Sequence, residues 1–261
     1  MNLNLVDRTV VVTGGSRGIG LACARVFLEE GCRVALVAKS HERLLSAVET
    51  LGAPADRLRA YEADLSDPRA TATVFATIER DLGLPDILVN SAGAAQRHGP
   101  GDLSSAVYQA ALDAKFFPTI NAIDAVLKGM VARGAGVIVN VIGMGGKVAA
   151  TSHIAGGAAN SALMLVTAGL GKAYAGQGVR VVGVNPGRTL TDRVQAGLTV
   201  EAQVSGVTFD EARRRAEAEI PLGRFARPDE VATLVLFLAS DAGSYLTGTT
   251  ISMDGGASGV L

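Results

Sequence analysis

The sequence predicts a doubly wound α/β fold in which a seven-stranded parallel sheet carries helices on both faces. Three observations lead to this prediction. Short apolar runs alternate with longer helical segments, which is typical of a parallel sheet covered on both sides. The first run, Thr9–Val12, leads through a glycine-rich turn into a helix. The 261 residues contain no internal repeat or low-complexity linker, so we expect a single domain over 1–261.

The first half of the chain alternates regularly. Strands are expected at 9–12, 33–37, 58–63 and 87–89. Ser40 is expected to cap a helix over 41–51, because a serine oxygen accepts a bond from the unpaired N–H groups of the first turn. Asp67 and Pro68 are expected to open a helix that runs to Leu82, since proline suits the first helical position.

The second half continues the alternation with one interruption. Strands are expected at 137–141, 179–184 and 249–253, two helices over 104–133, and further helices over 154–175 and 228–239. Residues 188–221 are charged, helical and outside the pattern, and 201–220 looks like one amphipathic helix. We expect this segment to form a mobile lobe over a site.

Composition limits the function. Hydrophobic residues make up 48% of the chain and charged residues 19%, which indicates a globular protein. The net charge of -1 argues against nucleic acid or an anionic membrane as the main partner. Cys23 and Cys32 give no disulfide framework, no apolar run of membrane-span length is visible, and no signal peptide pattern begins the chain. We therefore expect a cytoplasmic protein, and we predict no metal site.

The turn at 13–20, TGGSRGIG, indicates a phosphate-binding device. Its glycines, Gly14, Gly18 and Gly20, have the spacing GxxxGxG between a strand and a helix. Glycine lets a ligand approach the main chain closely. The helix start offers free N–H groups and the positive end of the helix dipole. We expect this turn to hold the pyrophosphate of a dinucleotide.

Further motifs follow in a fixed order along the chain. They are Asp64-Leu65, Asn90-Ser91-Ala92-Gly93, Asn185-Pro186-Gly187 with Thr191, Arg227-Pro228-Asp229-Glu230, Tyr245-Leu246-Thr247-Gly248 and Asp254-Gly255-Gly256. Together with the glycine turn they resemble the short-chain dehydrogenase/reductase family over nearly the whole chain. The resemblance implies a Rossmann fold, a nicotinamide cofactor, a small-molecule substrate and a homo-oligomer, usually a tetramer.

The resemblance also implies cofactor-binding residues. Those expected around the phosphates and adenosine are Gly14, Ser16, Arg17, Gly18, Ile19, Gly20, Asp64 and Leu65. Those expected at the ribose and nicotinamide are Asn90, Ala92, Gly93, Pro186, Gly187 and Thr191. The alternative is that these glycines only form turns.

The end of the second strand favours NADP(H) over NAD(H). A carboxylate there would accept a hydrogen bond from the ribose 2′-OH and repel a 2′-phosphate. This chain has Ala38, followed by Lys39, with Arg17 in the nearby turn. Two cations and no acid favour a phosphate. The alternative is that both are ordinary surface charges.

The catalytic residues that this family resemblance implies are replaced by other residues in this sequence. The family uses a Tyr to exchange a proton, a Lys four residues later, a Ser to orient the substrate and an Asn in an earlier helix. Counting from the flanking motifs, we find Gly156 at the Tyr position, Asn160 at the Lys position, Gly143 at the Ser position and Lys115 at the Asn position. Asn160 stands where the family has a lysine, and we hypothesise that Lys115 supplies the missing ammonium from the opposite wall of the site. If Lys115 is desolvated, its pKa should be lowered. The alternative is that Lys115 points to solvent.

A proton donor is then needed, and His153 is the main candidate. It lies three residues before Gly156, and histidine suits proton transfer near neutral pH. If helical, it would be about one turn away. Ser152, Lys147 and His98 are weaker candidates, and each of these residues has the alternative of being an ordinary loop residue.

The sequence therefore predicts an NADP(H)-dependent oxidoreductase of a small carbonyl or alcohol, with displaced catalytic groups. Two alternatives stay open. One is a non-catalytic NADP(H)-binding protein, such as a sensor. The other is a non-redox lyase or hydrolase that reuses the pocket.

Overall fold

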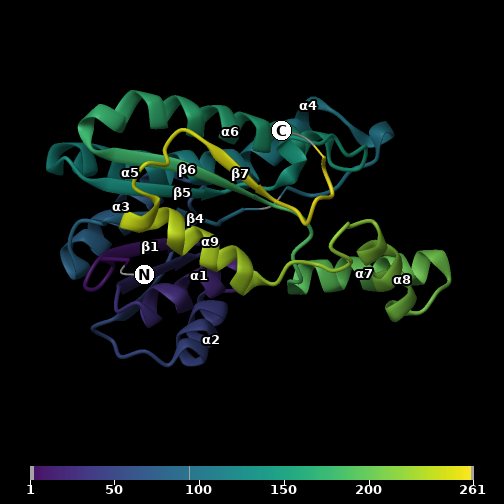
Figure 1. Ribbon diagram of the computed structural model, residues 1–261, viewed down its shortest axis with the longest axis horizontal. Helices are drawn as coiled ribbons and strands as arrows, with labels where there is room; N and C mark the ends of the chain where they lie inside the picture. The colour runs from purple at the N-terminus through teal and green to yellow at the C-terminus, as the bar shows by residue number, and fades with distance from the viewer. Residues whose placement is uncertain (1–2, 94, 260–261) are drawn as a thin grey trace.

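The computed structural model describes residues 3–93 and 95–259. A single seven-stranded parallel sheet, in the order β3-β2-β1-β4-β5-β6-β7, forms its centre, which confirms the predicted fold (Figure 1). The strands are β1 (Thr9–Thr13), β2 (Arg33–Ala38), β3 (Leu58–Glu62), β4 (Ile87–Asn90), β5 (Gly136–Val141), β6 (Val179–Pro186) and β7 (Thr250–Met253). The helices are α1 (Gly18–Glu29), α2 (His41–Leu51), α3 (Pro68–Leu82), α4 (Ser105–Ala111), α5 (Phe117–Arg133), α6 (Ile154–Tyr174), α7 (Asp192–Ser205), α8 (Phe209–Ala218) and α9 (Pro228–Ala239).

Two hydrophobic layers hold the helices on the sheet. All five residues of β1 are buried, because both faces of a parallel sheet are covered. Val10 and Val12 pack on one face with α1, α2 and α9, whereas Val11 packs on the other face with α3 and α5. Successive side chains of a strand point to opposite faces, so one apolar run supplies both layers.

The predicted helix starts are confirmed. The Ser40 side chain accepts a hydrogen bond of 3.4 Å from the Arg43 N–H at the start of α2. The Asp67 side chain accepts one of 2.8 Å from the Arg69 N–H, and Pro68 follows at the first position of α3. These caps fix where the chain turns back after β2 and β3, at the edge of the sheet that carries the site.

The strand order reverses between β1 and β4. The chain builds outward from β1 to β3 and then crosses to β4 on the other side of β1. The loops that follow β1 and β4 therefore diverge at the carboxyl ends of adjacent strands. In sheets of this type, the crevice at such a switch point is where ligands bind.

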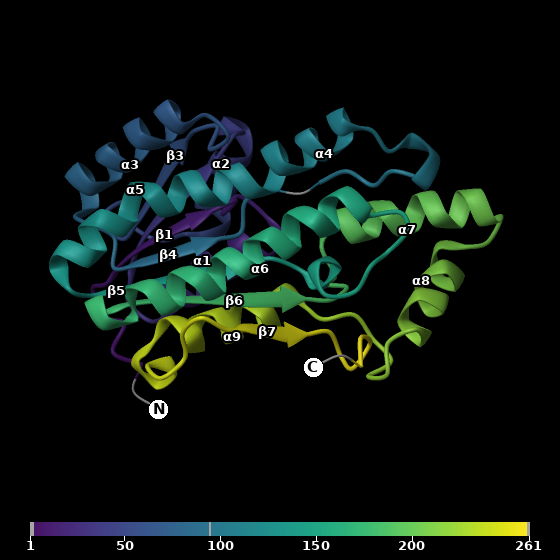
Figure 2. The ribbon, with the colours of Figure 1, turned by 90° about the horizontal axis from the view of Figure 1, so that it is seen from above.

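The expected lobe projects beyond the carboxyl ends of β6 and β7, as both views show (Figures 1 and 2). The single helix expected over 201–220 is wrong. Gly206, with φ of +64°, ends α7 in the left-handed conformation that glycine adopts easily, and Thr208 caps α8 by accepting a bond from the Glu211 N–H. A backbone bridge between Thr189 and Ala226 closes the base of the lobe.

The helix α6 contradicts the expectation that no apolar run reaches membrane-span length. The segment Ile154–Gln177, which contains α6, is long and apolar enough by length and composition to cross a membrane, with a mean hydropathy of 1.4. The statement that no segment has this length is therefore wrong. In the structure α6 packs against β6 and buries Leu163, Thr167 and Gly171 among others. A helix that packs into a large core is apolar for that reason.

Candidate active site

A cavity of about 840 Å³ lies at the switch point and extends under the lobe. Its walls come from the ends of β1, β2, β4, β5 and β6, from α6 and from the start of α7. This space, called here the large cavity, is the candidate active site.

The glycine turn forms one wall of the large cavity. Gly14 has φ of +66°, and a Cβ placed on it would lie 2.8 Å from the Ala92 Cα. Only glycine lets the turn approach the loop after β4 this closely. The turn ends at Gly18, where α1 begins with its free N–H groups directed at the large cavity.

Most of the expected cofactor residues line the large cavity. They are Gly14, Ser16, Arg17, Gly18, Ile19, Lys39, Leu65, Ala92, Gly93, Pro186, Gly187 and Thr191. Gly20 instead allows α1 to pack against the Gly14 carbonyl. Asn90 is buried in the sheet, where its amide donates a 3.0 Å bond to Asn140 and its oxygen accepts one of 3.3 Å from Thr13. Gly20 and Asn90 therefore shape the site without lining it.

Three cations follow the carboxyl ends of β1 and β2. Arg17, Lys39 and Arg43 all line the large cavity and are exposed to solvent, and we call them the strand-2 cluster. Asp64 does not line the large cavity and forms an ion pair of 2.8 Å with Lys39.

Within residues 3–93 and 95–259, Arg17 and Arg43 form no ion pair. The sequence analysis missed Arg43, although the Ser40 cap placed it in the first turn of the helix after the second strand.

Lys115 enters the large cavity from a widened helical turn. Residues Leu112–Phe116 form a π-helical turn between α4 and α5, a feature often found at functional sites. The Lys115 side chain is buried, with 7% of the residue exposed, and its Nζ donates a 2.9 Å hydrogen bond to the Val141 carbonyl at the end of β5. The alternative that this lysine faces solvent is therefore wrong.

The close packing around Lys115 depends on Gly93. A Cβ on Gly93 would overlap the Ala114 carbonyl, so only glycine lets this helical turn reach the loop after β4. Burial, together with the positive charge of Arg193, lowers the pKa of Lys115 from its ordinary value of 10.5 to about 8. An amine with this pKa can exchange protons near neutral pH.

Asn160 reaches the same strand end from α6. It is buried, and its amide nitrogen lies 3.4 Å from where a Cβ on Gly143 would be. Gly143 follows β5, two residues after the Val141 carbonyl that Lys115 contacts. Lys115 and Asn160 thus lie in the wall of one cavity, at the end of one strand.

The His153 ring occupies the space beside Gly156. His153 is the N-cap residue of α6, so it stands at the start of this helix as expected, but its φ of -139° is not helical. Its ring lies over Gly156, where a Cβ would overlap it, and a Cβ on Gly145 would lie 3.0 Å from its Cδ2. The ring lines the large cavity, and its buried Nδ1 has no hydrogen-bond partner among the described residues.

Positive charges surround His153. Desolvation lowers the pKa of its imidazole below 6.5, and the charges of Arg97, Arg193 and Lys115 lower it further. Arg97 and Arg193 line the large cavity, and neither was identified from the sequence. We call Arg97, Lys115, His153 and Arg193 the inner cluster.

The weaker candidates lie outside the large cavity. The Lys147 Nζ donates a 3.1 Å bond to Ser252, and the Ser152 hydroxyl accepts one of 3.0 Å from Arg97. His98 donates its backbone N–H to the Ser152 carbonyl at 3.1 Å, which ties the loop after β4 to the loop before α6. These residues position the wall of the site.

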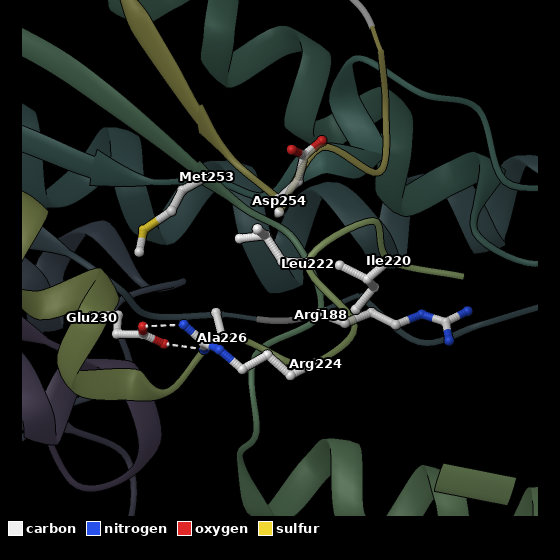
Figure 3. A pocket seen from close by; sticks show the side chains of 9 residues that line it. Arg188, Ile220, Leu222, Arg224, Ala226, Glu230, Met253 and Asp254 are labelled. Atoms are coloured by element: carbon white, nitrogen blue, oxygen red, sulfur yellow. Dashed lines mark hydrogen bonds and ion pairs between the residues drawn. The ribbon is translucent and has the colours of Figure 1, made fainter. Parts of the chain in front are cut away.

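A second cavity, of about 80 Å³, lies behind the lobe (Figure 3). Its charged groups are already satisfied, because the Arg224 guanidinium holds the Glu230 carboxylate with bonds of 2.7 and 2.8 Å. Glu230 also accepts a 2.7 Å bond from the Arg227 N–H at the start of α9. This cavity is part of the junction between the lobe and the sheet.

Comparison with known proteins agrees with this arrangement. A family model described as enoyl-(acyl carrier protein) reductase matches residues 14–258. The chain is 32% identical over 263 residues to 2-(S)-hydroxypropyl-CoM dehydrogenase 3 of Xanthobacter autotrophicus, with 100% of each chain covered. The structure of L-sorbose reductase from Gluconobacter frateurii, complexed with NADPH and L-sorbose, matches with a TM-score of 0.94 and 27% identity, covering 100% of both chains.

A further solved structure carries the family name. It is an oxidoreductase of the short chain dehydrogenase/reductase family from Burkholderia thailandensis, with a TM-score of 0.85, 32% identity and coverage of 98% of this chain and 94% of that one. The match extends from the glycine turn after β1 to the segment after β7, and so includes every wall of the large cavity. The chain is therefore an oxidoreductase of the short-chain dehydrogenase/reductase family.

Proposed function

We propose that this protein is an NADP(H)-dependent oxidoreductase that interconverts a small carbonyl compound and its alcohol, and that Lys115 carries the proton chemistry while His153 orients the substrate. The observation that carries the proposal is the position of the Lys115 Nζ, buried in the wall of the large cavity and bonded to the Val141 carbonyl. An ammonium is costly to bury unless it is paired or hydrogen-bonded, and strongly perturbed pKa values cluster at functional sites.

The large cavity fits a nicotinamide dinucleotide. Its volume of about 840 Å³, the glycine turn at the start of α1 and the unpaired Arg17 and Arg43 suit an elongated ligand with several phosphates. The residues around Gly14–Ile19 would hold the pyrophosphate, and Pro186, Gly187 and Thr191 would border the nicotinamide. The cofactor supplies the hydride when it is bound.

The strand-2 cluster supports NADP(H) as the cofactor. Ala38 brings no carboxylate to repel a 2′-phosphate, and Arg17 and Arg43 present free guanidiniums that pair well with phosphate. Lys39 is shared with Asp64, so we assign the main phosphate contacts to the two arginines. L-sorbose reductase, whose structure this chain resembles, is complexed with NADPH.

Lys115 is assigned as the proton donor in the direction of reduction. With a pKa of about 8 it is mostly charged at pH 7, and it can stabilise a developing oxyanion and then protonate it. The Val141 carbonyl holds its Nζ at the end of β5. Asn160 is buried at the same strand end and lines the large cavity, and we assign its amide the role of orienting the substrate oxygen.

His153 receives a role different from the one expected from its sequence position. Because the pKa of its imidazole lies below 6.5, it is mainly neutral at pH 7 and is a poor acid. A neutral imidazole instead accepts a hydrogen bond, and we assign it to orienting the substrate hydroxyl. In the direction of oxidation the hydroxyl proton returns to the neutral amine of Lys115, the group that delivers it in the direction of reduction. The ring is placed for its orienting role by Gly145 and Gly156, which leave the space it fills.

Two measurements test the proposal. NADPH and NADH are titrated by the fluorescence of the reduced nicotinamide, and NADPH oxidation is then followed with a panel of small ketones and aldehydes. We expect tighter binding of NADPH and turnover that falls in Lys115→Met. Tight NADPH binding without turnover of any carbonyl or alcohol would favour a non-catalytic binding protein, and conversion without cofactor would favour a lyase or hydrolase.

A further inference from the structure

The inner cluster carries more positive charge than the proton chemistry of an uncharged substrate needs. Arg97 and Arg193 lie in the wall of the large cavity with Lys115 and His153. Within the described part of the chain, neither arginine forms an ion pair. Most arginines on the lobe and at its base are paired, as Arg213 is with Glu217 at 2.9 Å.

Like charges lie close enough together in the inner cluster to affect one another. The charges of Arg97 and Arg193 both act on His153, and the charge of Arg193 also acts on Lys115. Keeping cations together without a counter-ion is unfavourable. Arg97 and Arg193 are exposed, so the cost falls mainly on the buried Lys115 and the half-buried His153, where solvent screens charge less. A negatively charged ligand would remove this repulsion.

The acidic residues of the large cavity do not provide that counter-charge. They are Asp192 and Asp254. The Asp254 carboxylate accepts 3.0 Å bonds from the backbone N–H groups of Gly256 and Ser258. Asp192 is exposed in the first turn of α7 and forms no ion pair among the described residues.

The position of Arg97 separates it from the cofactor phosphates. It lies on the loop after β4, and its Nη1 donates a 3.0 Å bond to the Ser152 hydroxyl next to His153. Of the strand-2 cluster, Lys39 and Arg43 follow β2, with β1 between that strand and β4, whereas Arg17 lies on the turn after β1 and its charge acts on Arg193. Arg97 is therefore held beside the imidazole by a neutral partner that leaves its charge uncompensated.

We propose that the substrate is an anion, a small oxo or hydroxy compound bearing a carboxylate or phosphate, whose charged group is bound by Arg97 and Arg193 while its carbonyl or alcohol oxygen lies at Lys115 and His153. This assignment of substrate class rests on the proposed function. Guanidinium forms paired hydrogen bonds with either oxyanion, and two of them fix the orientation of a small molecule.

The test compares matched pairs of substrates that differ in charge. The carboxylate pair is 4-oxopentanoate and its methyl ester, and the phosphate pair is dihydroxyacetone phosphate and dihydroxyacetone. We expect kcat/KM to be about tenfold to 10²-fold higher for the anion of at least one pair, the range that charge-assisted hydrogen bonds provide. Added salt should reduce this preference, since it screens exposed charges.

Variants assign the preference to the two arginines. Arg97→Gln and Arg193→Gln should each reduce the preference for the anion about tenfold, measured as the ratio of kcat/KM for the anion to kcat/KM for the neutral compound of the same pair. Arg97→Lys should recover part of it, because the charge is kept. Arg25→Gln is the matched control, since Arg25 is an exposed arginine on α1 outside the large cavity.

A binding measurement keeps this test independent of turnover. The same compounds are titrated calorimetrically into the protein saturated with NADP⁺. Binding of an anion that depends on Arg97, without turnover of any compound, would support the anion site and overturn the proposed reaction.

Turnover of neutral compounds without any preference for the anion would overturn the anion site and leave the reaction standing. If Arg193→Gln weakened NADPH alone, Arg193 would belong to the cofactor and its place in this site would be wrong.

Discussion

The strand-2 cluster and the inner cluster are both groups of cations at the end of the same sheet, but their surroundings differ. Arg17, Lys39 and Arg43 are exposed, and one of them is paired with Asp64. The inner cluster combines two exposed arginines with a buried lysine and a half-buried histidine, and the pKa values of the last two are lowered. An exposed cation can hold a phosphate, whereas a desolvated group with a lowered pKa can move a proton.

The largest expected effect is on kcat, when Lys115 of the inner cluster is replaced. Lys115→Met keeps the length of the side chain and removes the ammonium. We expect kcat to fall by about 10²–10⁴, the usual contribution of a general acid. The dissociation constant for NADPH should change little, because the strand-2 cluster is intact. Steady-state kinetics and a fluorescence titration measure the two quantities.

A change beside the strand-2 cluster should alter cofactor affinity and leave kcat nearly unchanged. In Ala38→Asp, a carboxylate beside Arg17 and Lys39 would repel a 2′-phosphate and accept a hydrogen bond from a 2′-OH. We expect the ratio of NADPH to NADH affinity to fall by about 10²-fold, with kcat at saturating cofactor nearly unchanged. Ala38→Ser, which adds no charge, is the control. An unchanged ratio in Ala38→Asp would remove the strand-2 cluster from the 2′-position.

The position of His153 is tested by filling the space beneath it. Gly156→Ala places a Cβ where the imidazole lies, so the ring must move. We expect kcat to fall by about tenfold to 10²-fold, as small displacements of catalytic groups do. Gly169→Ala on the same helix is the matched control, because nothing lies within 4 Å of its Cβ. If Gly156→Ala were as active as Gly169→Ala, the imidazole would not be needed at this position.

A further expected effect is on stability, and it tests the burial of Lys115. Its pKa is about 8 in the folded protein and 10.5 when unfolded. The unfolded chain therefore binds more protons between these values, and the free energy of unfolding should rise as pH increases from 8 to 10.5. The full rise is about 3 kcal/mol relative to Lys115→Met, whose profile lacks it. Urea unfolding of both proteins without cofactor across this range measures the difference, and parallel profiles would contradict the burial.

The sheet could be predicted closely because its sequence signal is local. A buried parallel strand such as β1 is a short apolar run, and the caps at Ser40 and Asp67 are short-range features. The lobe could not be predicted as well. The break between α7 and α8 depends on Gly206 adopting a left-handed conformation, which a charged amphipathic pattern does not reveal.

The site was predicted unevenly, for physical reasons. The register of β1, β4 and β5 aligns Thr13, Asn90 and Asn140, so Asn90 bonds within the sheet instead of facing the large cavity. The inward direction of Lys115 depends on a π-helical turn that packs against Gly93, a long-range contact. Arg97 and Arg193 have no sequence pattern, because loop and lobe positions converge only in the folded chain.

The account depends on the separation of cofactor binding from proton transfer, and one crossed measurement tests it most directly. NADPH dissociation constants and single-turnover rates of NADPH oxidation are determined for Lys115→Met and Ala38→Asp in parallel. The account predicts that the first variant loses the rate and keeps NADPH affinity, while the second loses NADPH affinity and keeps the rate. A Lys115→Met protein that oxidises NADPH as fast as the wild type would contradict it.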